Sequence, residues 1–175
     1  MPVSTEELKN YIRSIPDFPK KGILFRDITT LLARPEAFHR AIEELRHRYL
    51  PTGIQKIVGI ESRGFIFSAP LAYAMGAGLV PIRKKGKLPY QTTSVTYDLE
   101  YGQDTLQMHT DAIRPREKVL VVDDLLATGG TARAACQLIE QLQGDVAGLA
   151  FLIELTDLRG RQSLQKYDVF SLIQY

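Results

Sequence analysis

The chain has few of the residues from which disulfide scaffolds and protein-held metal centres are built. Its 175 residues include one cysteine, three histidines and no tryptophan. The lone Cys136 excludes an internal disulfide, and no charged-then-apolar leader opens the chain, so we expect the reducing cytoplasm. His39 and His47 lie eight residues apart on a predicted helix and His109 is isolated, which is too sparse a set to predict a zinc site.

The chain also lacks a large excess of charge of either sign. The 22 Lys and Arg residues nearly balance the 20 Asp and Glu residues, which leaves a net charge of +2. Bulk attraction to nucleic acid or to a membrane surface is therefore not the expected primary function, and any anion binding must be local. With 45% apolar and 24% charged residues, the composition is that of a globular protein, and the length predicts a single domain over residues 1–175.

One uncharged run has the length of a membrane span. It covers the nineteen residues from Gly64 to Ile82. The run is interrupted by two prolines, Pro70 and Pro81, and by two glycines, Gly76 and Gly78. This punctuation predicts a helix that ends near Gly76 and a short strand after it, so we expect no contact with a membrane.

Short apolar strands alternate with helices along most of the chain, which predicts an α/β fold with an open, mostly parallel sheet and helices on both faces. The expected strands are 56–60, a segment around Leu79 and Val80, 119–122, 146–153 and 169–173, and the expected helices begin at Pro35, follow residue 64 and cover 131–143. Alternating Thr, Val and Tyr residues over 91–109 indicate an antiparallel excursion, and we expect a mobile flap within 83–109.

The N-terminal residues carry a different pattern. Ser4 and Glu7 form a capping-box pair, and apolar residues at helical spacing as far as Ile15 predict a short helix. Residues 16–30 combine two prolines, a glycine and apolar residues without a long period, which is typical of an irregular binding segment.

The strongest functional motif is VLVVDDLLATGGT, from Val119 to Thr131. A buried strand brings two carboxylates to the edge of the sheet at which open α/β folds bind ligands. The small residues that follow let backbone N–H groups converge on an anion at a helix start. The motif therefore predicts a monophosphate cradle, with Asp123 and Asp124 accepting hydrogen bonds from a ribose diol. No Gly-Lys-Ser/Thr and no G-x-G-x-x-G accompanies it, which disfavours the Walker and dinucleotide sites.

This motif resembles the phosphoribosyl-pyrophosphate signature of type I phosphoribosyltransferases. Four further stretches, in order and spacing, resemble the adenine phosphoribosyltransferase family: DFPKKGILFRDIT (17–29), GIESRGF (59–65), RKKGKLP (83–89) and YDLEYG (97–102). The resemblance spans nearly the whole chain. It implies purine salvage, in which adenine and 5-phosphoribosyl 1-pyrophosphate (PRPP) give AMP and pyrophosphate, and it implies a type I fold with an N-terminal hood within 1–33 and a homodimer.

The resemblance also implies site residues. For the ribose and 5′-phosphate of PRPP they are Asp123, Asp124, Ala127, Thr128, Gly129, Gly130 and Thr131. For pyrophosphate they are Glu61, Ser62, Arg63, Arg83, Lys84 and Lys87. For adenine they are Leu24, Phe25, Arg26 and Leu125. In the flap, Glu100 is the implied catalytic residue for proton transfer to or from the purine, and Tyr101 lies beside it. Since Mg²⁺ prefers substrate phosphates, we expect it to arrive with PRPP and predict no metal site made by the protein alone.

Two alternatives stay open on the sequence. One is a phosphoribosyltransferase for a 6-oxopurine, because no side chain must distinguish an amino group from an oxo group. The other is a phosphoribosyltransferase-fold regulator that senses PRPP and binds nucleic acid. The N-terminal segment disfavours this regulator, because its Lys9 and Arg13 are offset by Glu6 and Glu7 and no extended basic face is evident, so we expect no nucleic-acid partner.

Overall fold

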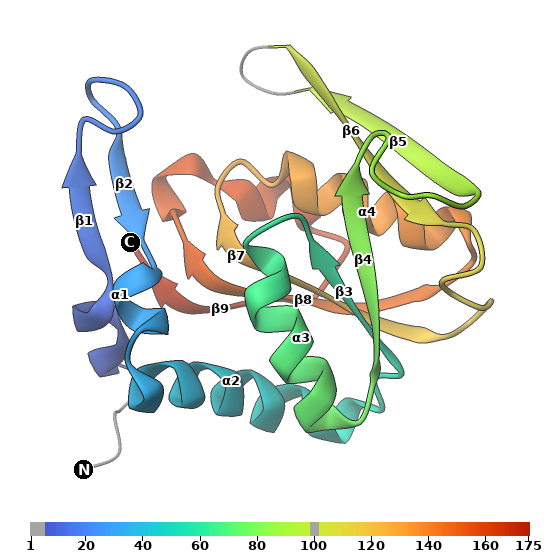
Figure 1. Cartoon of the computed structure of the whole chain (residues 1–175), viewed down its shortest axis with the longest axis horizontal. Helices are drawn as coiled ribbons and strands as arrows, with labels where there is room; N and C mark the ends of the chain where they lie inside the picture. The colour runs from blue at the N-terminus through green and yellow to red at the C-terminus, as the bar shows by residue number, and fades with distance from the viewer. Residues whose placement is uncertain (1–5, 99–101) are drawn as a thin grey trace.

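The computed structural model describes residues 6–98 and 102–175. A seven-stranded sheet is formed by β3 (Lys56–Ile60), β4 (Gly78–Lys84), β5 (Thr92–Asp98), β6 (Gln103–His109), β7 (Lys118–Leu126), β8 (Asp145–Glu154) and β9 (Val169–Gln174). Its strand order is β5-β6-β4-β3-β7-β8-β9 (Figure 1). The strands from β4 to β9 in this order are parallel, while β5 and β6 form an antiparallel hairpin at one edge. This confirms the mostly parallel sheet and the antiparallel excursion.

Helices cover both faces of the sheet, as the sequence predicts. On one face lie α2 (Pro35–Tyr49) and α3 (Gly64–Met75), and on the other lies α4 (Gly130–Gln141) (Figure 1). Because helices cover both faces of the sheet, strand β7 has apolar side chains on both of its faces. Leu120 and Val122 pack in the core on the α2 and α3 side, while Val119 and Val121 pack in the core on the α4 side. A strand covered on both sides must be apolar at every position rather than at alternate ones.

The uncharged run at 64–82 folds into two elements. It contains α3, which ends at Gly76 with a left-handed φ of 65°, and most of β4. Gly76 fits this end because a residue without Cβ adopts that conformation at little cost. In the part of the chain that the structure describes, no helix is both long and apolar enough to cross a bilayer.

The N-terminal segment differs from its expectation. A 3₁₀ helix, η1 (Glu6–Tyr11), stops before Ile15, which lies in β1 (Arg13–Pro16). Strand β1 pairs with β2 (Leu24–Asp27), so part of the segment expected to be irregular is a strand, and a short α1 (Thr29–Leu32) follows it. The pair is joined by an ion pair of 2.6 Å between Arg13 Nη2 and Asp27 Oδ2. Pairing between strands overrides the helical spacing, which depends only on neighbours along the chain.

The direction of the chain reverses at the middle of the sheet. From β3 the chain continues outward to β4, whereas from β7 it continues to β8 on the opposite side. The loops that follow β3 and β7 therefore diverge and leave a crevice at the carboxyl ends of these two strands. In open α/β sheets this switch point is where ligands bind.

Candidate functional site

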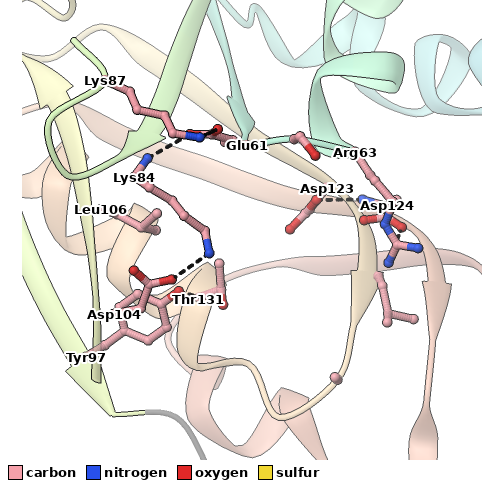
Figure 2. Close-up of a pocket in the computed structure, with 13 residues that line it drawn as sticks. Glu61, Arg63, Lys84, Lys87, Tyr97, Asp104, Leu106, Asp123, Asp124 and Thr131 are labelled. Atoms are coloured by element: carbon pink, nitrogen blue, oxygen red, sulfur yellow. Dashed lines mark hydrogen bonds and ion pairs between the residues drawn. The ribbon is translucent and has the colours of Figure 1, made fainter. Parts of the chain in front are cut away.

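A cavity of about 690 Å³ occupies this switch point, a size typical of small-molecule sites (Figure 2). Its walls come from the turn after β3, the end of β4, the hairpin of β5 and β6, and the end of β7. The lining residues are Glu61, Ser62, Arg63, Lys84, Lys87, Tyr97, Asp104, Leu106, Asp123, Asp124, Leu125, Ala127 and Thr131. The structure thus brings together residues predicted for the ribose, the phosphate and the pyrophosphate.

The two acids of the motif lie within β7, which continues to Leu126 and so extends beyond the strand expected from the sequence. The backbone N–H of Asp124 donates to Asp123 Oδ1 at 2.9 Å, and the Asp124 side chain is buried. Burial raises the pKa of both carboxyls, and the neighbouring charge of Asp124 raises the pKa of Asp123 further. Two neighbouring acceptors with raised pKa values are suited to a ligand that donates hydrogen bonds or carries positive charge.

Arg63 connects this acid pair to the hood. Its Nη2 lies 2.9 Å from Asp124 Oδ2, and this guanidinium opposes the rise in the pKa of Asp124. The same guanidinium lies 5.5 Å from the centre of the Phe25 ring. Arg63 therefore lies between the predicted adenine residue Phe25 and the predicted ribose residue Asp124.

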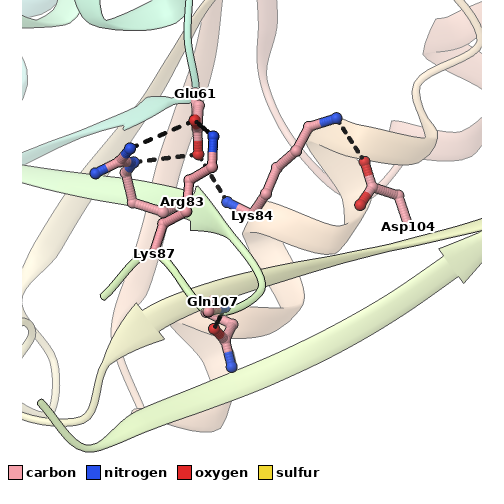
Figure 3. Close-up of polar contacts among 7 residues, drawn as sticks. Glu61, Arg83, Lys84, Lys87, Asp104 and Gln107 are labelled. Atoms are coloured by element: carbon pink, nitrogen blue, oxygen red, sulfur yellow. Dashed lines mark hydrogen bonds and ion pairs between the residues drawn. The ribbon is translucent and has the colours of Figure 1, made fainter. Parts of the chain in front are cut away.

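Glu61 gathers the cations that were predicted to bind pyrophosphate (Figure 3). Its carboxylate accepts hydrogen bonds from Arg83 Nε at 3.1 Å, from Lys87 Nζ at 2.6 Å and from the backbone N–H of Lys84 at 2.9 Å. The hydrogen bond from Arg83 is the largest of the effects that lower the pKa of Glu61 to about 2. Glu61 is therefore an anion at neutral pH, and its carboxylate holds Arg83 and Lys87; Lys87 lines the cavity, whereas Arg83 does not.

Lys84 uses its side chain elsewhere in the cavity. Its Nζ lies 3.1 Å from Asp104 Oδ2, on β6, and this contact is the main cause of a raised Lys84 pKa. All four predicted pyrophosphate cations thus have a carboxylate partner in the structure: Asp124 for Arg63, Glu61 for Arg83 and Lys87, and Asp104 for Lys84. An incoming anion must share or replace these partners.

The small-residue loop forms a second, smaller cavity of about 80 Å³, lined by Asp123 and residues 125–132. Gly129 has a left-handed φ of 85°, and α4 begins at Gly130. A helix N-terminus directs free N–H groups and the positive end of its dipole at this cavity. Thr131 Oγ1 donates to the hydroxyl of Tyr97, on the flap strand β5, at 3.2 Å.

The predicted adenine residues divide into two groups. Leu125 lines the large cavity, whereas Leu24, Phe25 and Arg26 lie on hood strand β2 and do not line it. The Arg26 guanidinium stacks 3.6 Å from the centre of the Tyr175 ring, and its Nη1 donates to Ser14 Oγ. The Arg26 side chain thus contacts Tyr175 and Ser14. The Phe25 ring contacts Arg63, and Arg63 in turn lines the cavity.

Sequence reasoning missed three lining residues, Tyr97, Asp104 and Leu106. All three belong to the β5–β6 hairpin. The signal that could have found Asp104 and Leu106 is the period of two along a strand, which places residues 104 and 106 on one face. The predicted flap residues Glu100 and Tyr101 lie outside the described residues.

Comparison with known proteins agrees with this arrangement. Residues 27–174 match the model of a family described as the phosphoribosyl transferase domain. The adenine phosphoribosyltransferase of Halothermothrix orenii is 58% identical over 168 residues, which cover 96% of this chain and 99% of that relative. A crystal structure of adenine phosphoribosyltransferase from Thermoanaerobacter pseudethanolicus superposes with a TM-score of 0.95 at 51% identity, over 98% of this chain and 100% of that one.

A second solved structure carries ligands. It is the adenine phosphoribosyltransferase of Saccharomyces cerevisiae, complexed with adenine and D-2,5-dideoxy-2,5-imino-altritol 1,6-bisphosphate. It has a TM-score of 0.92 to this chain at 41% identity, over 96% of this chain and 97% of that one.

Proposed function

The chain belongs to the adenine phosphoribosyltransferase family, whose members form AMP and pyrophosphate from adenine and PRPP, and we propose that this reaction takes place in the cavity between β3 and β7. The observation that carries the proposal is the position of an acid pair and a phosphate-sized cradle on one wall, opposite a cluster of cations. These three groups match a sugar diol, its 5′-phosphate and its pyrophosphate.

On the sugar side, Asp123 and Asp124 accept hydrogen bonds from the ribose hydroxyls, and the N–H groups of residues 127–131 bind the 5′-phosphate. The raised pKa values of the acid pair support this role, because donors from a diol stabilise the charged carboxylates. Fixing both ends of the sugar orients its anomeric carbon for attack.

On the leaving-group side, Arg83, Lys84 and Lys87 stabilise the negative charge that grows on pyrophosphate as the bond to the anomeric carbon breaks. Ser62 and Arg63 bind the same group from the turn after β3. Glu61 acts through its neighbours: the hydrogen bonds that its carboxylate accepts hold Arg83 and Lys87 in place.

The base enters between the hood and the end of β7. Phe25 and Leu125 contact its two faces, and the backbone of Leu24 and Arg26 reads its edge. The complex of the yeast relative with adenine supports a base site in this fold. Glu100 transfers the purine proton, a role that rests on the LEYG resemblance, in which Tyr101 is its neighbour in the flap sequence.

The cavity also suits Mg²⁺ carried by PRPP. The neighbouring carboxylates of Asp123 and Asp124 are oxygen donors of the kind that Mg²⁺ prefers, with the remaining ligands left to phosphate and water. When bound, the ion would neutralise charge on the pyrophosphate oxygens. No group of three potential metal-binding side chains is found among residues 6–98 and 102–175.

An apolar surface beside the site supports a homodimer. Ile66 and Tyr73 lie seven residues apart on α3, and Tyr73 is 91% exposed. Leu79 pairs with Ile57, which packs in the core on the α3 side, so Leu79 faces the same side of the sheet. A second copy would cover these residues, which we name the α3 face. We also propose one unit over 1–175 and a cytoplasmic location, which the buried, unpaired Cys136 favours.

Product analysis tests the proposed function. Adenine and PRPP should give AMP with Mg²⁺, and far less without it, whereas guanine, hypoxanthine and xanthine should give no nucleotide. Replacing both acids, by Asp123→Asn with Asp124→Asn, should raise the KM for PRPP and lower turnover while circular dichroism stays unchanged. Unaltered kinetics in this double variant would contradict the diol role.

A further inference from the structure

We propose that the segment Arg159–Leu164 is the floor of the phosphate cradle, and that Gly160 and Ser163 are positioning residues for the 5′-phosphate of PRPP and AMP. We call this segment the cradle floor. It begins 28 positions after Thr131, the last residue of the cradle, and it lines neither cavity of the site. The inference rests on the proposed role of residues 127–131 as the 5′-phosphate site.

The cradle and its floor are in direct contact at two glycines. A Cβ on Gly129 would lie 2.2 Å from Ser163 Oγ and 2.6 Å from the carbonyl oxygen of Gly160. A Cβ on Gly160 would lie 2.3 Å from the carbonyl oxygen of Ala127. Real Cβ atoms do not approach other atoms this closely, so a side chain at either position would separate the two segments.

The floor also determines where the peptide groups of the cradle point. The Ser163 hydroxyl lies 2.8 Å from Gly160 O and 3.3 Å from Thr128 O, so its single proton is shared between these two carbonyls. In a trans peptide the C=O and the N–H point in opposite directions. Because the carbonyls of Ala127 and Thr128 face the floor, the following N–H groups, of Thr128 and Gly129, face away from it and toward the small cavity.

The floor is itself fixed to the sheet. Arg161 donates to both carboxylate oxygens of the buried Glu154, at 2.7 Å each, and to the carbonyl oxygen of Val169 at 2.6 Å. Such a two-pronged contact between charged groups fixes direction as well as distance. Leu164 is buried in the core below α4. The floor is thus attached to β8 and β9, so its own position is fixed and it can determine the position of the cradle.

Gly160→Ala tests the proposal, because Gly160 lies outside the left-handed region and alanine is tolerated there by the backbone. The methyl group should displace Ala127 O and turn the cradle N–H groups. We expect the Kd of ribose 5-phosphate, measured by calorimetry, to rise about tenfold. The KM values for PRPP and for AMP should rise in parallel, while those for adenine and pyrophosphate, which lack a 5′-phosphate, stay within about twofold of wild type.

Two further variants complete the test. Gln162→Ala, in the same segment but with an exposed side chain, should bind ribose 5-phosphate as wild type does. Ser163→Ala removes one neutral hydrogen bond and should weaken the binding of ribose 5-phosphate about fivefold. If Gly160→Ala does not fold, this variant alone tests whether the floor positions the phosphate site. Equal affinity of Ser163→Ala and wild type, or an equal rise in all four KM values in Gly160→Ala, would overturn the role of the floor. If wild type fails to bind ribose 5-phosphate, the proposed phosphate site itself is wrong.

Discussion

At the scale of single residues, the acid pair works against the stability of the empty protein. Burial and mutual repulsion raise the pKa of Asp123, so the folded chain holds protons more tightly there than the unfolded chain does. Between the pKa of Asp123 in the unfolded chain and its higher pKa in the folded chain, the stability of the fold decreases as pH rises. At neutral pH the folded state therefore disfavours the charged form of this carboxyl. In the proposed function, this cost to stability is offset when the ribose diol binds.

We therefore expect Asp123→Asn to stabilise the empty protein while it impairs the enzyme. The amide oxygen can still accept the Asp124 N–H, but the buried charge is gone. Tm should rise by about 2–4 °C at pH 7, as a gain of about 1 kcal/mol would produce in a chain of this size. The KM for PRPP should rise as well. Calorimetric scans from pH 4 to 8 should show the difference in Tm growing with pH, and a difference independent of pH would contradict this account.

The pKa of Glu61 is shifted in the opposite direction, so its effect on stability depends on pH in the opposite way. Its pKa is lowered to about 2 in the folded protein, so the stability that its charge contributes is complete above its ordinary pKa and is lost as pH falls toward 2. Glu61→Gln should lower Tm at pH 6, and its difference from wild type should shrink as the pH falls from 5 to 3. In the reverse reaction, the KM for pyrophosphate should rise more than the KM for AMP, because Arg83 and Lys87 lose their common acceptor. Equal changes in both would argue against a role at the pyrophosphate.

At the scale of elements, the hood depends on the last strand. The ring of Tyr175, beyond β9, is contacted by Lys9 Nζ at 4.3 Å and by the Arg26 guanidinium at 3.6 Å. Thr156 donates to the Tyr175 carbonyl through both its backbone N–H and its hydroxyl. One aromatic ring thus joins η1 and β2 to the central sheet.

Tyr175→Ala should loosen the hood and leave the sugar site intact. We expect the KM for adenine to rise about fivefold, since two cation–π contacts are lost, with little change in the KM for PRPP. Tyr175→Phe keeps the ring and should behave as wild type. Hydrogen exchange over 13–27 should quicken in the alanine variant alone, and unchanged exchange would show that the ring does not hold the hood.

The central elements could be predicted because their signals are local. An uninterrupted apolar strand, Pro35 at a helix start and Gly76 at a helix end depend only on neighbouring residues. The β1–β2 pair could not be predicted in this way, because Ile15 and Phe25 are partners across ten positions of sequence. The same reason explains the cradle floor: its contact with Gly129 exists only after β8 has placed residue 160 beside residue 127.

For the site, the motifs identified which residues meet but not how they pair. The resemblance places Glu61 and the cations in one group, and the structure shows that the Glu61 carboxylate accepts hydrogen bonds from the side chains of Arg83 and Lys87. Asp104 has no neighbouring motif, and its importance comes from the register of β6 against β4, which brings it to Lys84. Contacts of this kind follow from strand pairing rather than from spacing along the chain.

At the scale of the whole molecule, α3 begins directly after Ser62 and Arg63, so the proposed dimer contact and the proposed pyrophosphate turn share a helix. Tyr73→Glu should give a particle of single-chain mass by light scattering, where wild type gives twice that mass, because a charge is placed at the most exposed residue of the apolar surface. Leu158→Glu, an equally simple exposed change at the end of the short 3₁₀ helix η3 (Thr156–Leu158), should stay dimeric. A wild-type chain of single mass would refute the homodimer.

Strands β1 and β2 of the hood form a separate two-stranded sheet, and within the described residues they share no strand pairing with the seven-stranded sheet. The hood therefore carries Phe25 and the backbone of Leu24 and Arg26 on a separate pair of strands, whereas the other proposed base contact, Leu125, lies on β7 with the proposed sugar site. Replacing residues 13–27 by the corresponding hairpin of a relative with another nucleobase preference should therefore change base selectivity only in part, because Leu125 stays in place, while the KM for PRPP stays close to that of wild type.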